Sequence, residues 1–535
     1  MFDTIILNGI IIDGTKKSRY HSDIGIYNGN IKAIGNLNNS EAKNFINAEN
    51  LIVSPGFIDI HSHSDLSLLV DPGGESKVHQ GVTTEVTGNC SLSPFPTGKA
   101  SPEILQKSIV GQILDSDINW KWKTLDDWAQ NLESNGLSIN IAPQVGQAAL
   151  QIATGATKNQ PATKKQIEEM KFLLIETIEQ GAFSLSTGLS LAPSIYSSTN
   201  EIIELCKSIS QFPDIFYATH AREAPGNQFK MIEEAIQIGQ QANIPVQFSH
   251  IAIIDHRFYG SGPKMIRLFE KAFSGGLDIS YDIYPYTAAG AGLNQAVPTW
   301  AQSGTINEYL KRIKNSKNRE KIKSEITNGI GGLKQKWSNW IISDIKNTNN
   351  KNILGLSIEE ISHQRNISPA ETILQIIEEE RGAVPTTVHN RLESDVKYFL
   401  SHELAMIGSD GNAISPNGFY KNSIPHPRFY GTFPRILGRY TKGNKKILSL
   451  ENAIYKMSGF PAKRLKMKKR GTIKINNIAD LVIFNPETII DQATFENPHQ
   501  YSIGIHHVLV NGISVIKNGK HTNAIPGKVL RRGKT

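Results

Sequence analysis

The stretch PGFIDIHSHSDL, at residues 55–66, carries two histidines separated by one residue. In a strand, residues two apart point to the same face, so His61 and His63 would lie side by side in one row with Asp59. Imidazoles beside a carboxylate suit a divalent transition metal. An isolated His-x-His pair is usually a pair of loop histidines that binds nothing, because the pattern is short. Here the apolar run before the pair and the acidic residues on both sides favour metal binding.

Polar or reactive side chains close other strand-like runs along the chain. Such runs alternate with helical patterns in the central part of the sequence, and they read GFIDIHSH, TTEVTGNC, INIAPQVG, AFSLSTGL, IFYATHAR, PVQFSHIA, LDISYDIYPY and LAMIGSDG. The alternation predicts parallel strands joined by helices, and the number of runs is that of a (β/α)8 barrel. A further candidate strand, VPTTVHN around Val388, has no predicted place in this barrel.

The residues that close these runs should converge on one face, because barrel active sites lie at the C-terminal ends of the strands. The candidate metal ligands are His61, His63, Cys90, His220, His250 and Asp410. Taken singly, His220 and His250 would be buried, hydrogen-bonded histidines and Cys90 a quiet buried thiol. Taken together, these three form a ligand set that leaves one coordination position open for water, as catalytic zinc requires.

Such a site also needs a proton acceptor. A bound metal lowers the pKa of its water to about 7, and a base must take the water proton and return it to the leaving group. Asp410, in the sequence GSDG after an apolar run, is the best candidate for this base. The alternative is a turn aspartate before Gly411.

The chain as a whole has the composition of a globular protein with more than one domain. Its 535 residues exceed the usual size of a single core. The net charge of +8 is modest, and the basic runs near the C-terminus lack interleaved aromatics, so we expect no nucleic-acid partner. No apolar run reaches membrane-spanning length, and the N-terminal stretch resembles a strand and turn more than a signal peptide. A cytoplasmic protein with a small-molecule substrate and no membrane partner is expected.

The two cysteines lie in different contexts, so no disulfide framework is expected. Cys206 stands in a helical pattern with apolar neighbours and is predicted to be a core residue.

Both ends of the chain consist of short β segments with hairpin signals. These signals are Asn8-Gly9, Asn28-Gly29, Asn511-Gly512 and Asn518-Gly519. They predict one small β domain built from residues 1–54 and 461–535, which flanks a barrel of residues 55–460. A helical insertion at about residues 297–351 is too long for a plain loop. It would be either a lid or pocket wall over the barrel mouth or a structural embellishment.

The sequence resembles the amidohydrolase superfamily and, within it, the N-acyl-D-amino-acid deacylase (D-aminoacylase) family. The resemblance runs from end to end and is carried by PGFIDIHSHSD, GVTTEVTGNCSLSPFP, GAFSLSTGL, YATHAR, QFSHIA, DIYPYTA, IGSDG, HPRFYGTFPRILG and IADLVIFNP. It implies a metal-bearing (β/α)8 barrel with a small β-sandwich made from both termini.

The resemblance also implies roles for particular residues. Cys90 matches a cysteine that replaces the carboxylated lysine of many relatives, and with His220 and His250 it would form a tight zinc site. His61 and His63 match a second, weaker site, which Cys90 could bridge.

Three further matches concern catalysis and substrate. Asp410 matches the catalytic aspartate, Arg428 matches the arginine that grips the substrate carboxylate, and Tyr284 matches a tyrosine that assists it. The implied reaction is zinc-dependent hydrolysis of an N-acyl-D-amino acid to a carboxylate and a free D-amino acid. The alternatives are a cyclic-amide hydrolase similar to hydantoinase or dihydroorotase, and a scaffold protein that has lost catalysis.

Three positions depart from the family pattern. Gln147 stands where the family often has a histidine, Gly290 where it commonly has a serine, and Ala252 where it frequently has a lysine. These changes spare the metal ligands but alter the substrate pocket. Because Ala252 removes a cation, a neutral or apolar substrate side chain is expected.

Overall fold

A computed structural model describes residues 1–98, 105, 118, 120–223, 226–330, 332–382, 384–443 and 446–534. Each of the predicted barrel runs contains a strand. These strands are β6 (Phe57–Asp59), β7 (Val82–Thr87), β8 (Asn140–Pro143), β10 (Ser184–Gly188), β11 (Phe216–His220), β12 (Val246–Phe248), β13 (Ile279–Ile283) and β17 (Ala405–Ile407). Their neighbours pair in parallel, in the order β6-β7-β8 and then β9 (Val145–Gly146)-β10-β11-β12-β13-β17. Only Gln144 separates β8 from β9, so the two sheets continue into one another.

The barrel closes between its last and first strands through loop backbone. Ser62 and Gly411 form a parallel bridge, Asp410 N donates to His61 O at 2.8 Å, and His63 N donates to Gly411 O at 3.1 Å. The predicted (β/α)8 fold is thus confirmed.

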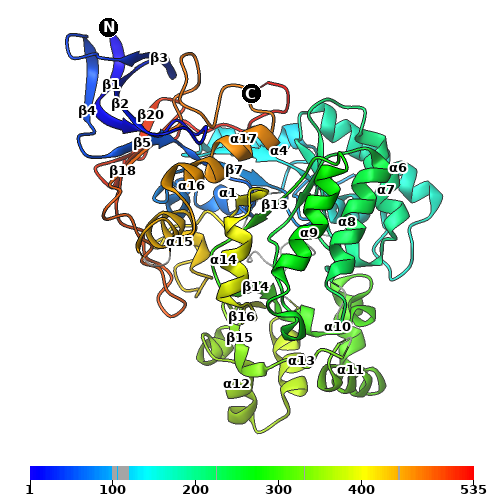
Figure 1. Cartoon of the computed structure of the whole chain (residues 1–535). Coiled ribbons are helices and arrows are strands. Elements are labelled where there is room, and N and C mark those ends of the chain that lie inside the picture. The colour runs from blue at the N-terminus through cyan, green and yellow to red at the C-terminus, as the bar shows by residue number, and fades with distance from the viewer. Residues whose placement is uncertain are drawn as a thin grey trace.

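Helices cover the outside of the barrel, and Figure 1 shows α7 (Thr199–Ile209), α8 (Phe229–Ala242) and α9 (Gly262–Ser274) side by side. The sequence provides a helix start for α7 at Ser198, whose side chain accepts from Glu201 N at the N-cap, and for α9 a proline in the first turn. The buried face of α7 includes Cys206, as predicted, and both cysteines are free. Among the described residues, no helix is both long and apolar enough to cross a membrane.

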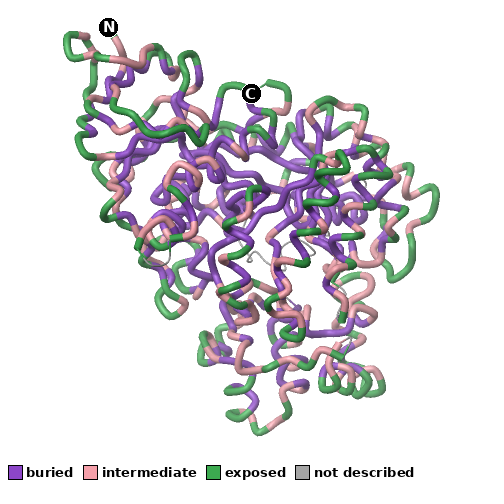
Figure 2. Tube along the Cα trace, in the orientation of Figure 1, coloured by how far each residue is buried: buried purple, intermediate pink, exposed green. Residues whose placement is uncertain are grey.

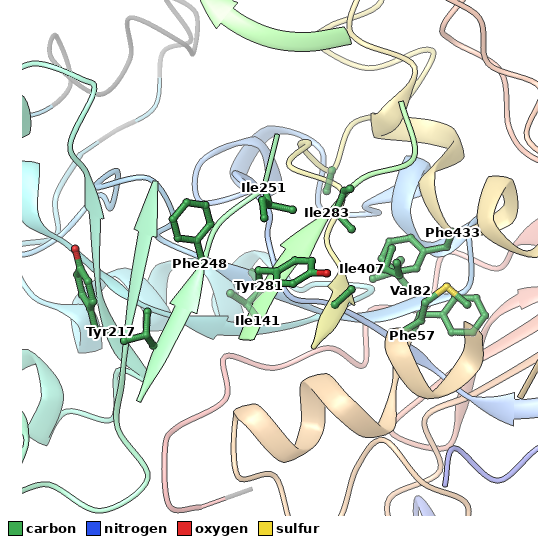
Figure 3. Packing of buried hydrophobic residues seen from close by; sticks show 14 of the residues in the cluster. Phe57, Val82, Ile141, Tyr217, Phe248, Ile251, Tyr281, Ile283, Ile407 and Phe433 are labelled. Carbon is green, nitrogen blue, oxygen red and sulfur yellow. The ribbon is translucent and has the colours of Figure 1, made fainter. Parts of the chain in front are cut away.

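Aromatic stacking against the barrel wall fixes the position of one helix. In Figure 3, Phe433 lies against Phe57, and the two rings stack with their centroids 5.7 Å apart. Phe433 belongs to α15 (Arg428–Arg435), which begins with Arg428, whereas Phe57 belongs to the strand that precedes His61. This contact therefore fixes the helix that carries the predicted substrate arginine against the strand that carries the predicted metal ligands.

Strands from both termini share one sheet. They are β1 (Phe2–Ile11), β2 (Tyr20–Tyr27), β3 (Asn30–Gly35), β4 (Ala42–Asn47), β5 (Ile52–Pro55), β18 (Leu481–Phe484), β19 (Ile505–Val510), β20 (Ile513–Lys517) and β21 (Lys520–His521). The two halves join where β5 pairs antiparallel with β18. Ile6 and Ile24 from the N-terminal half pack in one apolar core with Leu481 and Leu509 from the C-terminal half. The exact domain limits stay a prediction.

One of the hairpin predictions is wrong. The pairs at residues 28–29, 511–512 and 518–519 do form turns with positive φ angles between neighbouring strands. Asn8 also has a positive φ of 61°, but it lies inside β1, where the register against β2 shifts between Ile6 and Gly9. The Asn8-Gly9 pair thus makes a β-bulge, because an extra residue in a continuous strand can use the same backbone conformation as a turn.

A separate layer stands between β13 and β17 in the sequence and projects from the barrel (Figures 1 and 2). It contains α10 (Ile306–Lys314), α11 (Ser316–Asn328), α12 (Ile358–Arg365), α13 (Pro369–Glu379) and a small sheet in the order β14 (Ala288–Gly292), β16 (Pro385–His389), β15 (Trp340–Ile342). Val388, the strand residue without a predicted place, belongs to β16. The layer has its own apolar core, with members from Leu293 to Val388. The predicted limits of about 297–351 for the insertion stay a prediction.

A fully buried lysine lies where the barrel closes. Lys77, on α2 (Glu75–Val78), donates from Nζ to Asp59 Oδ2 at 2.8 Å and to Ser409 Oγ at 2.5 Å, and it lies 3.0 Å from Glu85 Oε1. Nζ also donates to Gly411 O at 3.2 Å. The lysine and both carboxylates have no exposed surface. Lys77 therefore joins the first strand, the second strand and the loop after the last strand.

Replacing this lysine should destabilise the barrel. Lys77→Met would leave two buried carboxylates without their cation, which costs about 3–5 kcal/mol of unfolding free energy for a buried pair. The thermal unfolding midpoint should fall markedly. Lys171→Met is the control, because Lys171 makes partly exposed ion pairs with Glu168 and Glu204 and its loss should matter much less. Equal effects of the two substitutions would contradict a structural role for Lys77.

Candidate active site

Four predicted ligands meet at the C-terminal ends of the barrel strands. One ligand atom from each of His61, Cys90, His250 and Asp410 lies within 4.8 Å of the others. Cys90 Sγ is 3.3 Å from His61 Nε2 and 3.4 Å from His250 Nε2, and His61 Nε2 is 3.6 Å from Asp410 Oδ1. These residues follow β6, β7, β12 and β17, so they come from opposite parts of the barrel.

The two remaining predicted ligands adjoin this group. His220 Nδ1 lies 3.0 Å from His250 Nε2, and His63 Nε2 lies 3.0 Å from Asp410 Oδ1. The sequence grouped Cys90 with His220 and His250, whereas a four-residue group among the described residues joins Cys90 to His61, His250 and Asp410. The division of the six side chains between a tight and a weak metal site stays a prediction.

Three residues of the site have backbone conformations that sequence reasoning did not foresee. Cys90, His250 and Asp410 have φ angles of 52°, 34° and 52°. Such angles are uncommon for residues with a side chain and are held only where the surrounding structure enforces them. Each falls where the chain leaves its strand, and each turns a ligand atom toward the centre of the barrel mouth.

The charges of the group suit a divalent cation. Burial alone would raise the pKa of the Cys90 thiol, but the imidazoles of His61 and His250 hold it well below its usual range. Burial would also raise the pKa of Asp410, but Arg428 and His250 hold it well below its usual range. A thiolate, a carboxylate and imidazoles are the donors that zinc takes, and their protons are displaced when a metal binds.

Asp282 orients two of these ligands and was missed by sequence reasoning. Its Oδ1 lies 3.2 Å from His61 Nδ1 and accepts from the backbone N of His250 at 2.8 Å. Its Oδ2 accepts from Gln247 Nε2 at 2.9 Å. A carboxylate behind a ligating histidine fixes the ring and raises its basicity. The sequence offered one hint, a charged residue inside the buried strand β13.

The predicted substrate residues lie beside this group. Arg428 Nη1 is 3.0 Å from Asp410 Oδ2, and the Arg428 guanidinium lies over the Tyr284 ring, 4.7 Å from its centroid. Gly290 passes close by, since a Cβ atom there would be 2.8 Å from Arg428 Nη2. The absence of a side chain at Gly290 thus lets the arginine lie against β14. Gln147 is fully buried and donates to Ser197 Oγ at 2.7 Å.

A cavity of about 330 Å³ opens onto the ligand group. Ala252, Tyr284 and Gly290 line it, and apolar side chains form much of the rest of its wall. This apolar wall contains Leu191, Met231, Phe248, Ile330, Trp337 and Trp340. The last three come from the layer between β13 and β17, so that layer forms part of the pocket wall.

Known proteins are similar in sequence to this chain over nearly its whole length. The amidohydrolase family profile matches residues 381–516. The D-aminoacylase of Alcaligenes xylosoxydans xylosoxydans is 31% identical over 99% of this chain and 98% of its own length. This chain belongs to the D-aminoacylase family of amidohydrolases. The family inferred from the sequence motifs is thereby confirmed.

Solved structures agree with this assignment. A D-aminoacylase structure that addresses the functional role of the binuclear metal centre superposes with a TM-score of 0.83 at 31% identity, covering 99% of this chain and 100% of that one. The N-acyl-D-glutamate deacylase of Bordetella bronchiseptica, in complex with zinc and a phosphonate inhibitor, gives a TM-score of 0.82 at 26% identity, with 99% of both chains covered. The first of these relatives has a metal centre and the second binds zinc.

Removal of the thiolate should release metal. Cys90→Ala deletes the donor that touches both His61 and His250, so elemental analysis of the purified variant should show a large loss of tightly held zinc. Cys206→Ala is the matched control, because Cys206 is buried in α7 outside the ligand group and its loss should leave the zinc content unchanged. Full zinc retention in Cys90→Ala would rule out Cys90 as a ligand.

Proposed function

We propose that this member of the D-aminoacylase family is a zinc-dependent deacylase that hydrolyses N-acyl-D-amino acids to a carboxylate and a free D-amino acid. One observation carries the proposal: Asp410 touches the metal-ligand group through Oδ1 and the Arg428 guanidinium through Oδ2. The scissile amide of an N-acyl amino acid is two bonds from its α-carboxylate. A substrate can therefore present its amide to the ligand group and its carboxylate to the guanidinium at the same time.

The residues fit a zinc ion, because a buried thiolate, a buried carboxylate and imidazoles lie within coordinating reach of a common point. His61, Cys90, His250 and Asp410 would hold it, with His220 and His63 adjoining. Bound zinc supplies polarisation of the acyl carbonyl and a lowered water pKa of about 7.

The chain itself supplies proton transfer and orientation. Asp410 would accept the proton of the attacking water and deliver it to the leaving nitrogen. Arg428 would hold the α-carboxylate through its planar fork of donors, with Tyr284 beneath the guanidinium. With the carboxylate and the amide both fixed, the α-hydrogen and the side chain can be placed in only one sense, which gives stereoselectivity.

The pocket favours a neutral side chain. Ala252 stands on the cavity wall where a lysine would add a cation, and Leu191, Met231 and Phe248 give the same cavity an apolar surface. An apolar side chain such as that of leucine gains by burial there, whereas a second carboxylate would lose its hydration. The preference for D over L rests on the likeness to D-aminoacylase.

Asp410→Asn tests the proton transfer. The amide is nearly isosteric but cannot accept a proton, so kcat should fall by about two to four orders of magnitude. Zinc content is measured on the same sample, because Asp410 also belongs to the ligand group. If zinc is retained and kcat barely changes, another residue is the base.

A substrate panel tests the rest of the proposal. We expect kcat/KM to be highest for N-acetyl-D-leucine, lower for N-acetyl-D-glutamate, and lowest for the L-enantiomer and for N-acetyl-D-leucinamide, which lacks the carboxylate. Preference for the L-enantiomer would refute the D assignment. Faster cleavage of a hydantoin than of any linear amide would identify a cyclic-amide hydrolase instead.

A further inference from the structure

A second arginine lines the substrate cavity, and two of its guanidinium nitrogens have no acceptor among the described residues. Arg391 follows β16, and its backbone N donates to Thr287 O at 3.1 Å, which fixes the start of the side chain. Its guanidinium lies over the Tyr284 ring, 4.3 Å from the centroid. Nε and Nη1 are buried and find no hydrogen-bond acceptor within the described part of the chain. The residue lines the same cavity as the metal-ligand group.

In the described part of the chain, the arginines that are buried as whole residues are paired. Arg464 donates to Asp278 at 2.9 Å and to Ser280 at 2.6 Å, and Arg470 forms an ion pair with Asp480. An uncompensated buried cation is costly, and folded proteins normally provide an anion or a ring of acceptors for it. Burial accordingly lowers the pKa of the Arg391 guanidinium. A buried guanidinium with free donors in a ligand cavity indicates that its partner is the ligand.

Charge balance indicates how many negative charges this ligand brings. Arg391 and Arg428 both stack on Tyr284, at 4.3 and 4.7 Å. The charge of Arg428 is met by Asp410, 3.0 Å away. Glu223, the other carboxylate that acts on Arg391, is exposed to solvent and too well hydrated to neutralise it. Asp410 also faces the metal-ligand group, so at least one positive charge remains at this end of the cavity, and a carboxylate would neutralise it.

We propose that Arg391 is a second carboxylate-binding residue, which holds the substrate α-carboxylate together with Arg428 beside the Tyr284 ring. This inference rests on the proposed function. Two planar guanidiniums can each offer parallel N–H donors to the carboxylate oxygens. Gly290 contributes no side-chain donor beside Arg428, and Arg391 supplies one from the end of the antiparallel partner strand of β14. The site accepts one carboxylate and leaves the substrate side chain to the apolar wall.

Kinetics of Arg391→Met and Arg391→Lys on zinc-loaded enzyme test this role. With N-acetyl-D-leucine, Arg391→Met should raise KM by about 10- to 100-fold, as expected for loss of a charge-assisted hydrogen bond, and change kcat much less. Arg391→Lys, which keeps the charge but not the fork, should recover part of the loss. N-acetyl-D-leucinamide should be hydrolysed by Arg391→Met and by wild type with the same kcat/KM. Equal losses on the acid and the amide would overturn the proposal.

A comparison of two substrates decides whether Arg391 binds the α-carboxylate or a side-chain carboxylate. If Arg391 binds the α-carboxylate, Arg391→Met should impair hydrolysis of N-acetyl-D-leucine and N-acetyl-D-glutamate by the same factor. A loss confined to N-acetyl-D-glutamate would assign Arg391 to an acidic side chain and overturn the proposal.

Stability measurements test whether Arg391 has a structural role instead. Because Arg391 has no anionic partner among the described residues, Arg391→Met should keep or raise the thermal midpoint measured without substrate. A lowered midpoint with unchanged KM would show that the arginine supports the fold instead. Lys321→Met is the control, since Lys321 also places a cation over an aromatic ring, that of Trp300 at 4.4 Å, but lies on the exposed side of α11. Its kinetics should equal those of wild type.

Calorimetric titration with N-acetyl-D-leucine distinguishes a failure of the Arg391 proposal from a failure of the proposed function. If wild type binds the ligand but hydrolyses none of the panel, the proposed function fails, and weaker binding by Arg391→Met still supports the carboxylate site. If wild type hydrolyses N-acetyl-D-leucine and Arg391→Met matches it in both KM and affinity, only the role of Arg391 fails. If wild type neither binds nor hydrolyses N-acyl amino acids, both proposals fail.

Discussion

The buried ammonium of Lys77 joins the parts of the barrel on which the rest of the site depends. Asp59, whose carboxylate it binds, lies two residues before His61, and Ser409, whose hydroxyl it reaches, immediately precedes Asp410. Between these two strands the closure contains one backbone bridge and no long ladder. The separation of His61 Nε2 from Asp410 Oδ1, 3.6 Å, is therefore set by a buried charge network as much as by strand pairing. A salt bridge in this place specifies geometry, which is the best attested use of buried charge.

A second constraint is the balance of charge at the barrel mouth. The Cys90 thiolate and the Asp410 carboxylate bring negative charge together in a buried space, and imidazoles surround them. A divalent cation would neutralise this negative charge at one end of the cavity. At the other end Arg428 has a carboxylate partner, Asp410, whereas Arg391 has none among the described residues. The cavity thus has one end suited to a metal and an amide and another suited to a carboxylate.

The apolar layer between β13 and β17 completes the pocket. Its own core holds Trp340, and Trp340 together with Trp337 also reaches the cavity. The same layer places β14 with Gly290 and β16 with the following Arg391 beside Tyr284. Part of the cavity wall and the metal-ligand group therefore come from different parts of the chain, which meet near Tyr284.

Local sequence was sufficient for the strands of the barrel and for the types of the metal ligands. Strand-like runs, helix starts and the reactive residues that close the runs depend on nearest neighbours, and for this reason the residues from His61 to Asp410 could be named and expected on one face. Local sequence was misleading at Asn8-Gly9, because a bulge and a hairpin use the same left-handed backbone, and only the partner strand decides between them. It gave no place to Val388, whose strand pairs inside a separate layer.

Tertiary structure alone decided how the ligands group, because Cys90, His250 and Asp410 reach one another with positive φ angles that local sequence did not indicate. It also decided the roles of Asp282 and Arg391. An aspartate in an apolar strand and an arginine after another strand are unremarkable in sequence. They stand out only in the fold: Asp282 lies beside His61, and two guanidinium nitrogens of Arg391 have no acceptor among the described residues. The sequence by itself determined the kinds of chemical group available to this protein, and only the fold determined the distances between them, since those distances join residues hundreds of positions apart.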